Sequence, residues 1–389
     1  MPELFPFEPD WQRPFRVEHS YKTEVIVSRG QQEQRIAGRQ FPRKTLEYDV
    51  KLSRGKLARF HAYMADNQQG NFWVPDWSRW LSPDATVATG TDEITVPEVP
   101  GWVLPGQQLW LREGGVDLLF EIAAVGPGTI QIVGTVPVDF TTAARAYCVY
   151  EATLDQRVRN RMMTNTVGQA SLKFTVKPGT LTESEPAAPL TFNGRELLLE
   201  KPDWATNPSV ELEGYLQEVD FDIGVTDHYA LTAFNRRYAQ LGYVFKTNAA
   251  AEAFMAFYRR RRGQRGEFYY PTWEPDIDVS LGALAAATTL DVPGVEFNAR
   301  FAGSSVYKAL IVFLKDGTTI TRQITGVALV SGNSQITVNA AWGQDVNSDT
   351  VRMVSLLPVW RFATDDVTVE WLTNMVAQVQ TTFCTLEDL

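Results

Sequence analysis

The sequence has few of the residues that catalysis and metal binding use most. Its 389 residues include three histidines, His19, His61 and His228, which stand in unrelated sequence contexts. The two cysteines, Cys148 and Cys384, form no CxxC pair. No phosphate-binding loop, nucleophile elbow or dinucleotide fingerprint is present. We therefore predict no enzyme activity, no cofactor and no metal site, and two reduced, buried thiols.

An excess of basic residues and a long apolar run are also missing. The chain carries 36 Lys and Arg against 46 Asp and Glu, a formal net charge of −10. This balance argues against a protein that grips nucleic acid by neutralising phosphates. No window approaches the length of a membrane span, and the opening residues lack the features of a signal peptide. We expect a chain that stays in a cytosol-like compartment unless a larger assembly carries it out.

Aromatic residues are abundant. They make up 12% of the chain, with 11 Trp, while 44% of residues are hydrophobic and 21% are charged. Such a composition predicts a folded protein with ample apolar surface to bury. The aromatic excess indicates either extended interfaces or sugar-binding platforms, and composition does not separate the two.

The chain is organised around a stretch that it contains twice, at residues 41–77 and 234–273. Both copies begin with a basic strand, FPRK or FNRR, continue with an amphipathic helix, and close with a Gly-x-Phe strand that leads to a Trp. We align the alternating apolar residues Leu46, Tyr48 and Val50 with Leu241, Tyr243 and Phe245, and Leu57 and Phe60 with Phe254 and Phe257. Each copy is predicted to be strand, helix, strand.

The repeat extends over nearly the whole chain. Pro9-Asp10-Trp11 matches Pro202-Asp203-Trp204, and Thr164-Asn165 matches Thr373-Asn374. We predict a mainly β protein with a few helices (α+β) that is internally duplicated. The predicted parts are a first module (1–80 with 148–176), a β barrel or sandwich insert (81–147), a linker (177–194), a second module (195–278 with 359–389) and a second β insert (279–358).

Local patterns predict the individual elements. Residues 1–20 resemble an extended arm that packs on a neighbour, and a hairpin follows from Tyr21 with its tip at residues 29–34. Further along we predict a helix at 53–65, a helical or irregular segment at 157–163, a strand at 170–176, a hairpin or strand pair at 210–225 and a tight turn at Lys315-Asp316-Gly317.

Charged clusters and repeated tryptophans are candidate interface residues. The run Arg259 to Arg262 ends the second helix, where cations complement the helix dipole, so it is either a solvated helix end or an interface ion-pair cluster. Acidic pairs at Asp365-Asp366 and Asp276/Asp278 are read as surface acids, with the two carboxylates of a glycosidase as the alternative. The candidate subunit-interface residues are Trp11, Arg35, Trp77, Arg259, Arg260, Arg261, Arg262 and Trp273.

These motifs together resemble a known family. A Trp-Pro-rich opening, the hairpin sequence Gly30-Gln31-Gln32-Glu33-Gln34-Arg35, the PRK strand, the G-x-F-x-x-P-x-W strand and RFATDD before VEWL resemble distal tail or baseplate proteins of long-tailed bacteriophages. The EQR element is clear only in the first half. In that family the tube-type module is a β sandwich with one flanking helix, closes into rings around a channel, and has no enzymatic activity.

The resemblance implies a structural virion protein at the tail tip. Its expected partners are copies of itself, the tail tube protein, baseplate hub or fibre proteins and the tape measure protein, with DNA passing through unbound. We prefer a trimer whose six modules form a pseudo-sixfold ring, with a hexamer as the alternative. Two other classes stay open: a carbohydrate-binding or cell-wall-degrading β protein, and a soluble monomeric β protein.

Overall fold

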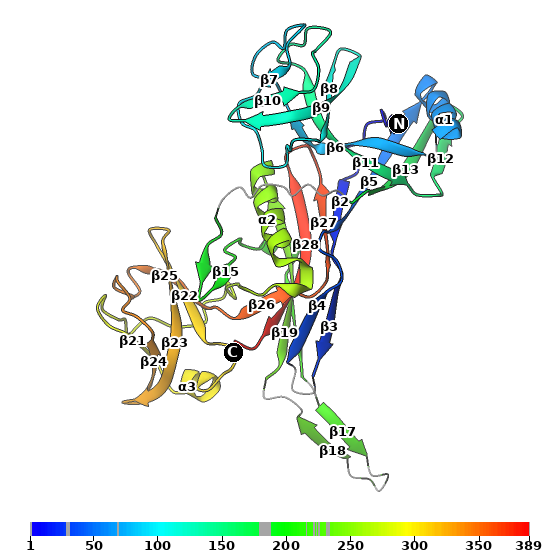
Figure 1. Ribbon diagram of the computed structural model, residues 1–389. Coiled ribbons are helices and arrows are strands. Elements are labelled where there is room, and N and C mark those ends of the chain that lie inside the picture. The colour runs from blue at the N-terminus through cyan, green and yellow to red at the C-terminus, as the bar shows by residue number, and fades with distance from the viewer. Residues whose placement is uncertain are drawn as a thin grey trace.

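The computed structural model describes residues 2–28, 32–67, 70–178, 188–214, 216–220, 222, 224, 226–230 and 234–388. It is a mainly β protein with three α-helices, as predicted. Most strands join one large sheet system, and smaller sheets lie at its periphery (Figure 1). Part of the predicted tip of the first hairpin (29–31 of 29–34), most of the predicted linker (179–187) and Val225 lie outside the described residues.

The first half contains two groups of elements. One is the module itself, made of β1 (Glu3–Leu4), β2 (Phe15–Ser20), β3 (Thr23–Val27), β4 (Glu33–Ala37), β5 (Arg43–Ser53), α1 (Gly55–Asn67), β6 (Asn71–Leu81), β11 (Arg145–Leu154), β12 (Arg159–Thr164) and β13 (Val167–Val176). The other lies between β6 and β11 and contains β7 (Glu93–Thr95), β8 (Gln108–Glu113), β9 (Val116–Gly126) and β10 (Thr129–Ile132).

The second half follows a similar plan. Its module contains β14 (Thr191–Phe192), β15 (Arg195–Leu197), η1 (Trp204–Thr206), β16 (Ser209–Glu213), β17 (Leu216–Asp220), β18 (Thr226–Ala230), β19 (Arg236–Phe245), α2 (Asn248–Arg261), η2 (Gly263–Arg265), β20 (Phe268–Tyr269), β26 (Val359–Phe362), β27 (Asp366–Trp371) and β28 (Ala377–Leu386). Between β20 and β26 lie β21 (Thr289–Val292), α3 (Glu296–Phe301), β22 (Ala309–Leu314), β23 (Thr319–Val330), β24 (Asn333–Val338) and β25 (Val351–Leu356).

The two halves share one strand order. In the first half the neighbours run β2-β5-β13-β11-β6-β1, with β12 also beside β13. In the second half they run β16-β19-β28-β26-β20-β15, with β27 also beside β28. Even the one parallel pair recurs, since β1 runs parallel to β6 and β15 runs parallel to β20. This correspondence is what an internal duplication predicts.

The pairing registers define which residues correspond. Leu52 lies opposite Gly168 as Phe245 lies opposite Ala377, and both Thr164-Asn165 and Thr373-Asn374 fall at the hairpin turn that precedes the last module strand. In these registers the FPRK and FNRR segments, and the two Thr-Asn pairs, occupy equivalent positions. Our alignment inside β5 is wrong by two residues, because the registers place Leu46, Tyr48 and Val50 over Ala239, Leu241 and Tyr243.

The segments between the two parts of each module form small β units with their own cores. The first packs its apolar residues around Ile94, Leu109 and Ile130. The second contains the sheet β21-β24-β23-β22-β25 together with α3, a helix that the sequence reading missed. Its predicted turn at Lys315-Asp316-Gly317 is confirmed, since Gly317 has φ +90° and joins β22 to β23.

The cores of the two modules merge into one. Phe15 and Val17 of the first module belong to the same buried cluster as Phe257 and Phe383 of the second. The first helix buries Leu57, Phe60 and Met64, the face that the sequence predicted, although the helix begins two residues later than expected. Aromatic rings dominate the second part of this core, where Phe257, Phe268, Phe362 and Phe383 pack with ring centroids 4.9–5.8 Å apart.

Three local predictions are wrong. Residues 157–163 were expected to be helical or irregular, but β12 forms a hairpin with β13. Two strands, β16 and β17, lie where a hairpin or strand pair was expected at 210–225, but they do not pair with each other, because β16 joins β19 and β17 forms a hairpin with β18. The opening arm was expected to pack on a neighbouring molecule, but its Phe5 and Phe7 are buried in the core of their own module.

Candidate assembly interface

The two modules of one chain meet edge to edge through a pair of strands. β2 of the first module pairs antiparallel with β27 of the second, from Phe15 opposite Trp371 to Ser20 opposite Asp366. The junction extends both sheets without a break, because β2 also pairs with β5 and β27 with β28. On its outer face Arg16 Nε donates to Glu370 Oε1 at 2.8 Å. Edge pairing of this kind removes two open sheet edges.

The β3–β4 hairpin strengthens the junction with a buried ion cluster. Glu33 of β4 accepts from Arg361 at 2.8 Å on both carboxylate oxygens and also pairs with Arg236, both residues of the second module. Burial by itself would raise the pKa of Glu33, but the hydrogen bond and charge of Arg361 and the charge of Arg236 outweigh it and lower the pKa. The same cluster raises the pKa of both arginines against the effect of burial.

Neighbouring residues of the hairpin add further contacts. Arg35 pairs with Glu267 and donates to the Arg265 carbonyl at 3.0 Å. The Tyr21 ring lies 5.6 Å from that of Tyr258, whose hydroxyl donates to the His19 carbonyl at 3.1 Å. The hairpin is therefore fastened to the second module by both ions and rings.

A third contact joins β6 to the helix α2. Arg79 donates from Nε and Nη2 to the two oxygens of Glu252, at 2.8 and 2.7 Å. Beside it the buried Asp76 accepts from Lys44 at 2.8 Å. Burial would raise the pKa of Asp76, but the charges of Lys44 and Arg79 lower it. A bidentate Arg–carboxylate pair fixes orientation as well as distance, so these contacts hold the two modules at one angle.

The far edges of the two modules are open. Within the described residues β16 pairs only with β19, and β12 pairs only with β13. All five residues of β16 are exposed, and β12 is exposed except at Asn160. Apolar side chains lie on these edges, with Leu212 69% and Met163 55% exposed.

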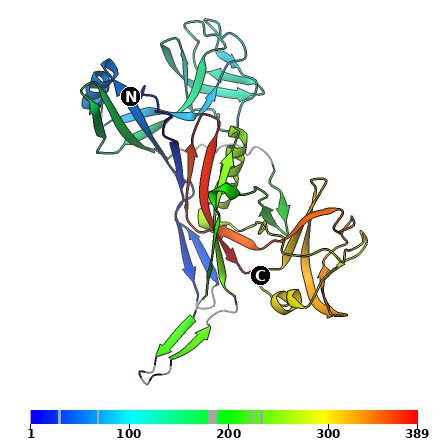
Figure 2. The same ribbon diagram turned by 180° about the vertical axis from the view of Figure 1, so that it is seen from behind.

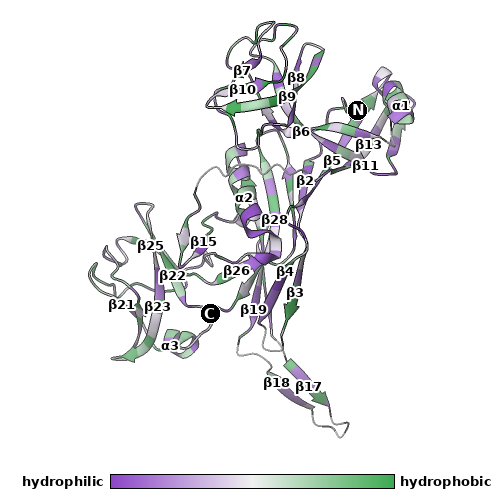
Figure 3. Ribbon diagram, viewed as in Figure 1, coloured by the Kyte–Doolittle hydropathy of each residue, from purple (hydrophilic) through white to green (hydrophobic). Residues whose placement is uncertain are grey.

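The β17–β18 hairpin is a second exposed feature of this end. It corresponds to β3–β4, because Leu216 lies opposite Ala230 as Thr23 lies opposite Ala37. It projects beyond the rest of the chain (Figure 1, Figure 2). Hydrophobic stretches colour both β3 and β17 (Figure 3). Exposed apolar residues on the two hairpins, including Ile26, Ile36, Leu216 and Tyr229, mark a surface suited to protein contact.

The predicted interface tryptophans have different environments. Trp77 is only 4% exposed and packs against Trp110 and Tyr147, so it is a core residue and its placement at a subunit surface is wrong. Trp273 is partly buried and stacks on Phe313 of the second insert at 4.9 Å. Trp11 is 38% exposed and is accessible.

The arginine run forms an ion-pair cluster within its own module. Arg260 Nε donates to Glu196 Oε1 at 3.1 Å, and Arg261 Nη2 lies 2.9 Å from Glu196 Oε2. The Arg259 carbonyl accepts from the Tyr21 hydroxyl at 3.4 Å. Arg262 ends the helix with φ +55° and is exposed. Of the eight candidates, Arg35 lies at the junction of the two modules within one chain, and the Arg259 carbonyl reaches the same junction through Tyr21. Trp11 and Arg262 are exposed.

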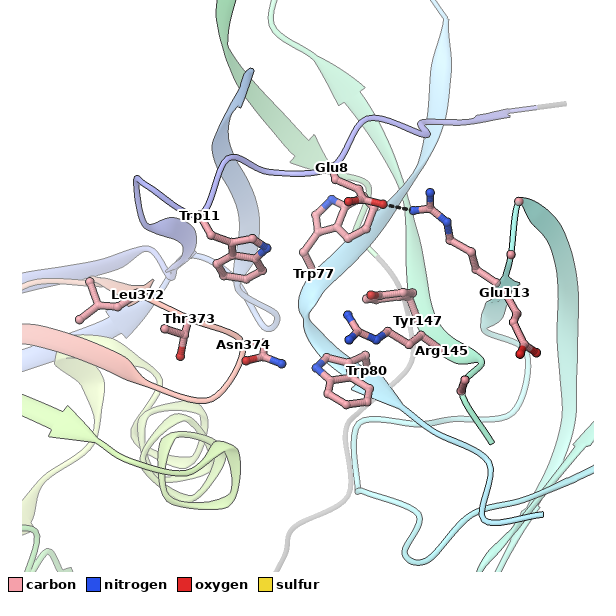
Figure 4. Close-up of a pocket in the computed structure, with 14 residues that line it drawn as sticks. Glu8, Trp11, Trp77, Trp80, Glu113, Arg145, Tyr147, Leu372, Thr373 and Asn374 are labelled. Atoms are coloured by element: carbon pink, nitrogen blue, oxygen red, sulfur yellow. Dashed lines mark hydrogen bonds and ion pairs between the residues drawn. The ribbon is translucent and has the colours of Figure 1, made fainter. Parts of the chain in front are cut away.

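A hollow of about 690 Å³ lies where the first module, its insert and the β27–β28 turn meet (Figure 4). Trp11 faces the turn residues Leu372 and Asn374 across it. The guanidinium of Arg145 lies 4.9 Å from the centre of the Trp80 ring, so one face of that ring is covered. The hollow is thus a seam of the junction with one accessible tryptophan.

The acidic residues considered as a possible pair of glycosidase carboxylates accept hydrogen bonds from backbone amides. Asp365 accepts from the amides of Thr23 and Gln264, and Asp276 accepts from the Leu356 amide at 2.8 Å. Burial raises the pKa of Asp276. Within the described residues, no group of three or more His, Cys, Asp or Glu side chains could hold a metal ion. No helix in that part of the chain is long and apolar enough to cross a membrane.

No protein-family model and no curated protein matches this chain.

Proposed function

We propose that this chain is a structural subunit of the tail tip or baseplate of a long-tailed bacteriophage. Copies form a ring that joins the tail tube to the baseplate hub around the DNA channel. Its neighbours in the virion are the tail tube protein, hub or fibre proteins and the tape measure protein. The proposal rests on the family resemblance of the sequence motifs together with the edge-to-edge arrangement of like modules.

The observation that carries the proposal is the β2–β27 junction. Two modules with the same strand order are joined side by side in one chain, and the matching edges at both ends, β16 and β12, stay open. A unit with two different open edges adds further units head to tail, and such a series either closes as a ring or continues as a filament. Ring closure is the outcome that suits a protein around a channel.

Charge is consistent with DNA that passes without being held. The net charge of −10 gives no electrostatic affinity for phosphates. Three chains supply six modules, so a trimer presents pseudo-sixfold symmetry to a tube and true threefold symmetry to a hub. We prefer this trimer, and a ring of six chains is the alternative.

Native mass spectrometry and electron cryomicroscopy of the purified chain test the proposal. The expected result is a closed ring of three chains with a central opening, and six chains would correct the stoichiometry while preserving the function. A chain that stays monomeric at tens of micromolar, or that is absent from tail tips in immunogold images, would refute it.

The exposed Trp11 beside the hollow is the observation that favours the second candidate, a carbohydrate-binding protein. Stacking on sugars requires an open ring face. Trp77 is buried and one face of the Trp80 ring is covered by Arg145, so these two tryptophans offer little open ring surface. Binding of the monomeric chain to a glycan array, lost in Trp11→Ala, would support this alternative against the ring.

A further inference from the structure

The β2–β27 junction has an open counterpart at the outer edges of the chain. β16 has the position in the second half that β2 has in the first, and β12 has the position that β27 has in the second. We propose that β16 of one copy pairs antiparallel with β12 of a second copy, in the register that β2 makes with β27. The inference rests on the proposed ring, since it names the contact that joins one chain to the next.

The register follows from pairings within the chain. Arg16 lies opposite Glu47 as Ser209 lies opposite Gln240, and Glu370 lies opposite Gln378 as Arg161 lies opposite Gln169. Because Arg16 lies opposite Glu370, Ser209 of one copy falls opposite Arg161 of the next. The pairs that follow along the strand are Val210 with Asn160, Glu211 with Arg159, Leu212 with Val158, and Glu213 with Arg157.

The charges of the two edges are complementary in this register. Directly opposite residues of an antiparallel pair lie on the same face, so Glu211 meets Arg159 and Glu213 meets Arg157 on one side of the sheet. All four side chains are exposed. In the described part of the chain, neither Glu211 nor Arg159 takes part in a side-chain hydrogen bond or ion pair. The register was derived from backbone pairing alone, so the match of charges is an independent observation.

The other face carries one mixed pair and one apolar pair. Val17 and Val369, which lie opposite each other in the β2–β27 junction, are 5% and 2% exposed. Their counterparts at the open edge are Val210, 48% exposed, and the half-buried Asn160. The next pair joins Leu212, the most exposed apolar residue of β16, to Val158, which packs at the edge of the module core. Pairing would bury this side as it does in the internal junction.

A tryptophan contact extends the match beyond the strands. Trp11 and Leu372 line the same hollow at the internal junction. Their counterparts are Trp204 and Met163, which are 50% and 55% exposed. In the proposed interface Trp204 of one copy reaches the β12–β13 turn of the next, where Met163 supplies an apolar partner.

Like edges repel each other, which selects the direction of assembly. Two β16 strands would bring glutamates together, and two β12 strands would bring arginines together. A twofold pair of identical edges is therefore disfavoured, whereas head-to-tail addition is favoured. First and second modules would then alternate around the proposed ring.

Charge reversal tests the pairing without touching the core. Variant A carries Arg157→Glu with Arg159→Glu, and variant B carries Glu211→Arg with Glu213→Arg. Each variant alone has two edges of one sign, so its dissociation constant should rise about tenfold or more, and the ring should be lost at low micromolar concentration. Mixing A with B restores complementary edges, and association should return. Circular dichroism and thermal unfolding of each variant check that both remain folded.

Cysteine cross-linking tests the register. Ser209→Cys with Arg161→Cys should give oxidised multimers on non-reducing gels, because the corresponding Arg16 and Glu370 are in contact across the internal junction. The matched control, Ser209→Cys with Met162→Cys, places the thiols on opposite faces and should cross-link at least tenfold more slowly. The native Cys148 and Cys384 are buried and do not interfere.

The outcomes separate this inference from the function on which it rests. Rings that form in the wild type but persist in both charge variants, or that give equal cross-linking in the control, overturn the β16–β12 pairing and leave the ring intact. A mixture of A and B that stays dissociated also overturns the pairing. A wild-type chain that never assembles refutes the proposed function itself.

Discussion

Replacing Glu33 by glutamine should release the β3–β4 hairpin from the second module. The Glu33 side chain is 2% exposed, and its partners Arg236 and Arg361 are 3% and 6% exposed. Glutamine keeps the shape but removes the charge, which leaves two buried guanidinium groups facing each other. Removing one partner of a buried ion pair costs about 3–5 kcal/mol, because the remaining charge stays desolvated without compensation.

Hydrogen exchange of the amides in residues 15–37, with the denaturant midpoint beside it, measures the effect. A loss of about 3–5 kcal/mol corresponds to roughly 10²–10⁴-fold faster exchange where opening is local. The matched control is Glu24→Gln, since Glu24 lies on the same hairpin with an exposed side chain. Equal protection in the two variants would refute the claim that the ion cluster fastens the hairpin.

Three further perturbations have defined outcomes. Acid should destabilise the junction, because folding lowers the pKa of Glu33. Glu33 therefore contributes fully to the free energy of unfolding above its ordinary pKa of 4.5, and the contribution is lost as pH falls through the lower folded pKa. The resulting decrease in stability at acid pH should be smaller in E33Q. Gly263 has φ +64°, and an alanine Cβ placed there would lie 2.5 Å from Asp365 Oδ1. Gly263→Ala should therefore lower the free energy of unfolding by about 1–3 kcal/mol in urea titrations. The loss should exceed that of Gly343→Ala, where φ is +82° but a Cβ would meet no atom within 4 Å. Phe268→Ala should lower the unfolding free energy by about 3–5 kcal/mol, and a loss below 1 kcal/mol would contradict a tightly packed aromatic core.

The repeated order of strands was predictable because several sequence anchors recur in both halves. FPRK with FNRR and Thr164-Asn165 with Thr373-Asn374 occupy equivalent positions in the paired strands. The interior of β5 was misaligned by two residues because a strand repeats its faces every two residues. A slip of two leaves every apolar side chain on the core face, so the alternation pattern fits both alignments equally well.

β12 escaped prediction because its sequence contains no β-branched run. Three arginines and two methionines between residues 157 and 163 carry weak strand propensity. The segment becomes a strand through its hairpin with β13, which in turn pairs with β5 more than a hundred residues away. Long-range strand pairing of this kind overrides local strand propensity, so it cannot be recognised from a short stretch of sequence.

The sequence showed the interface chemistry but not its geometry. Glu33 and Arg35 belong to the motif that carried the family resemblance, yet their partners Arg361 and Glu267 are more than two hundred residues away. The alternating arginines before Thr164 and the two glutamates of β16 are likewise visible in the sequence. Their opposition becomes apparent only when the internal junction supplies the register. Trp77 was misplaced because a repeated tryptophan is as typical of a core as of an interface.

Covalent linkage accounts for the difference in chemistry between the β2–β27 junction and the proposed β16–β12 junction. β2 and β27 belong to one chain, so their encounter is intramolecular and the hairpin beside them uses a buried ion cluster and aromatic rings. In the proposed ring, β16 and β12 stay unpaired until another copy arrives, and exposed charges on a sheet edge prevent indiscriminate pairing. The glutamates of β16 disfavour pairing of two β16 edges, and the arginines of β12 disfavour pairing of two β12 edges. The opposite charges favour pairing of β16 with β12. Under the proposed pairing, the differences between the two halves follow from their positions, since one junction forms within the chain and the other forms on assembly.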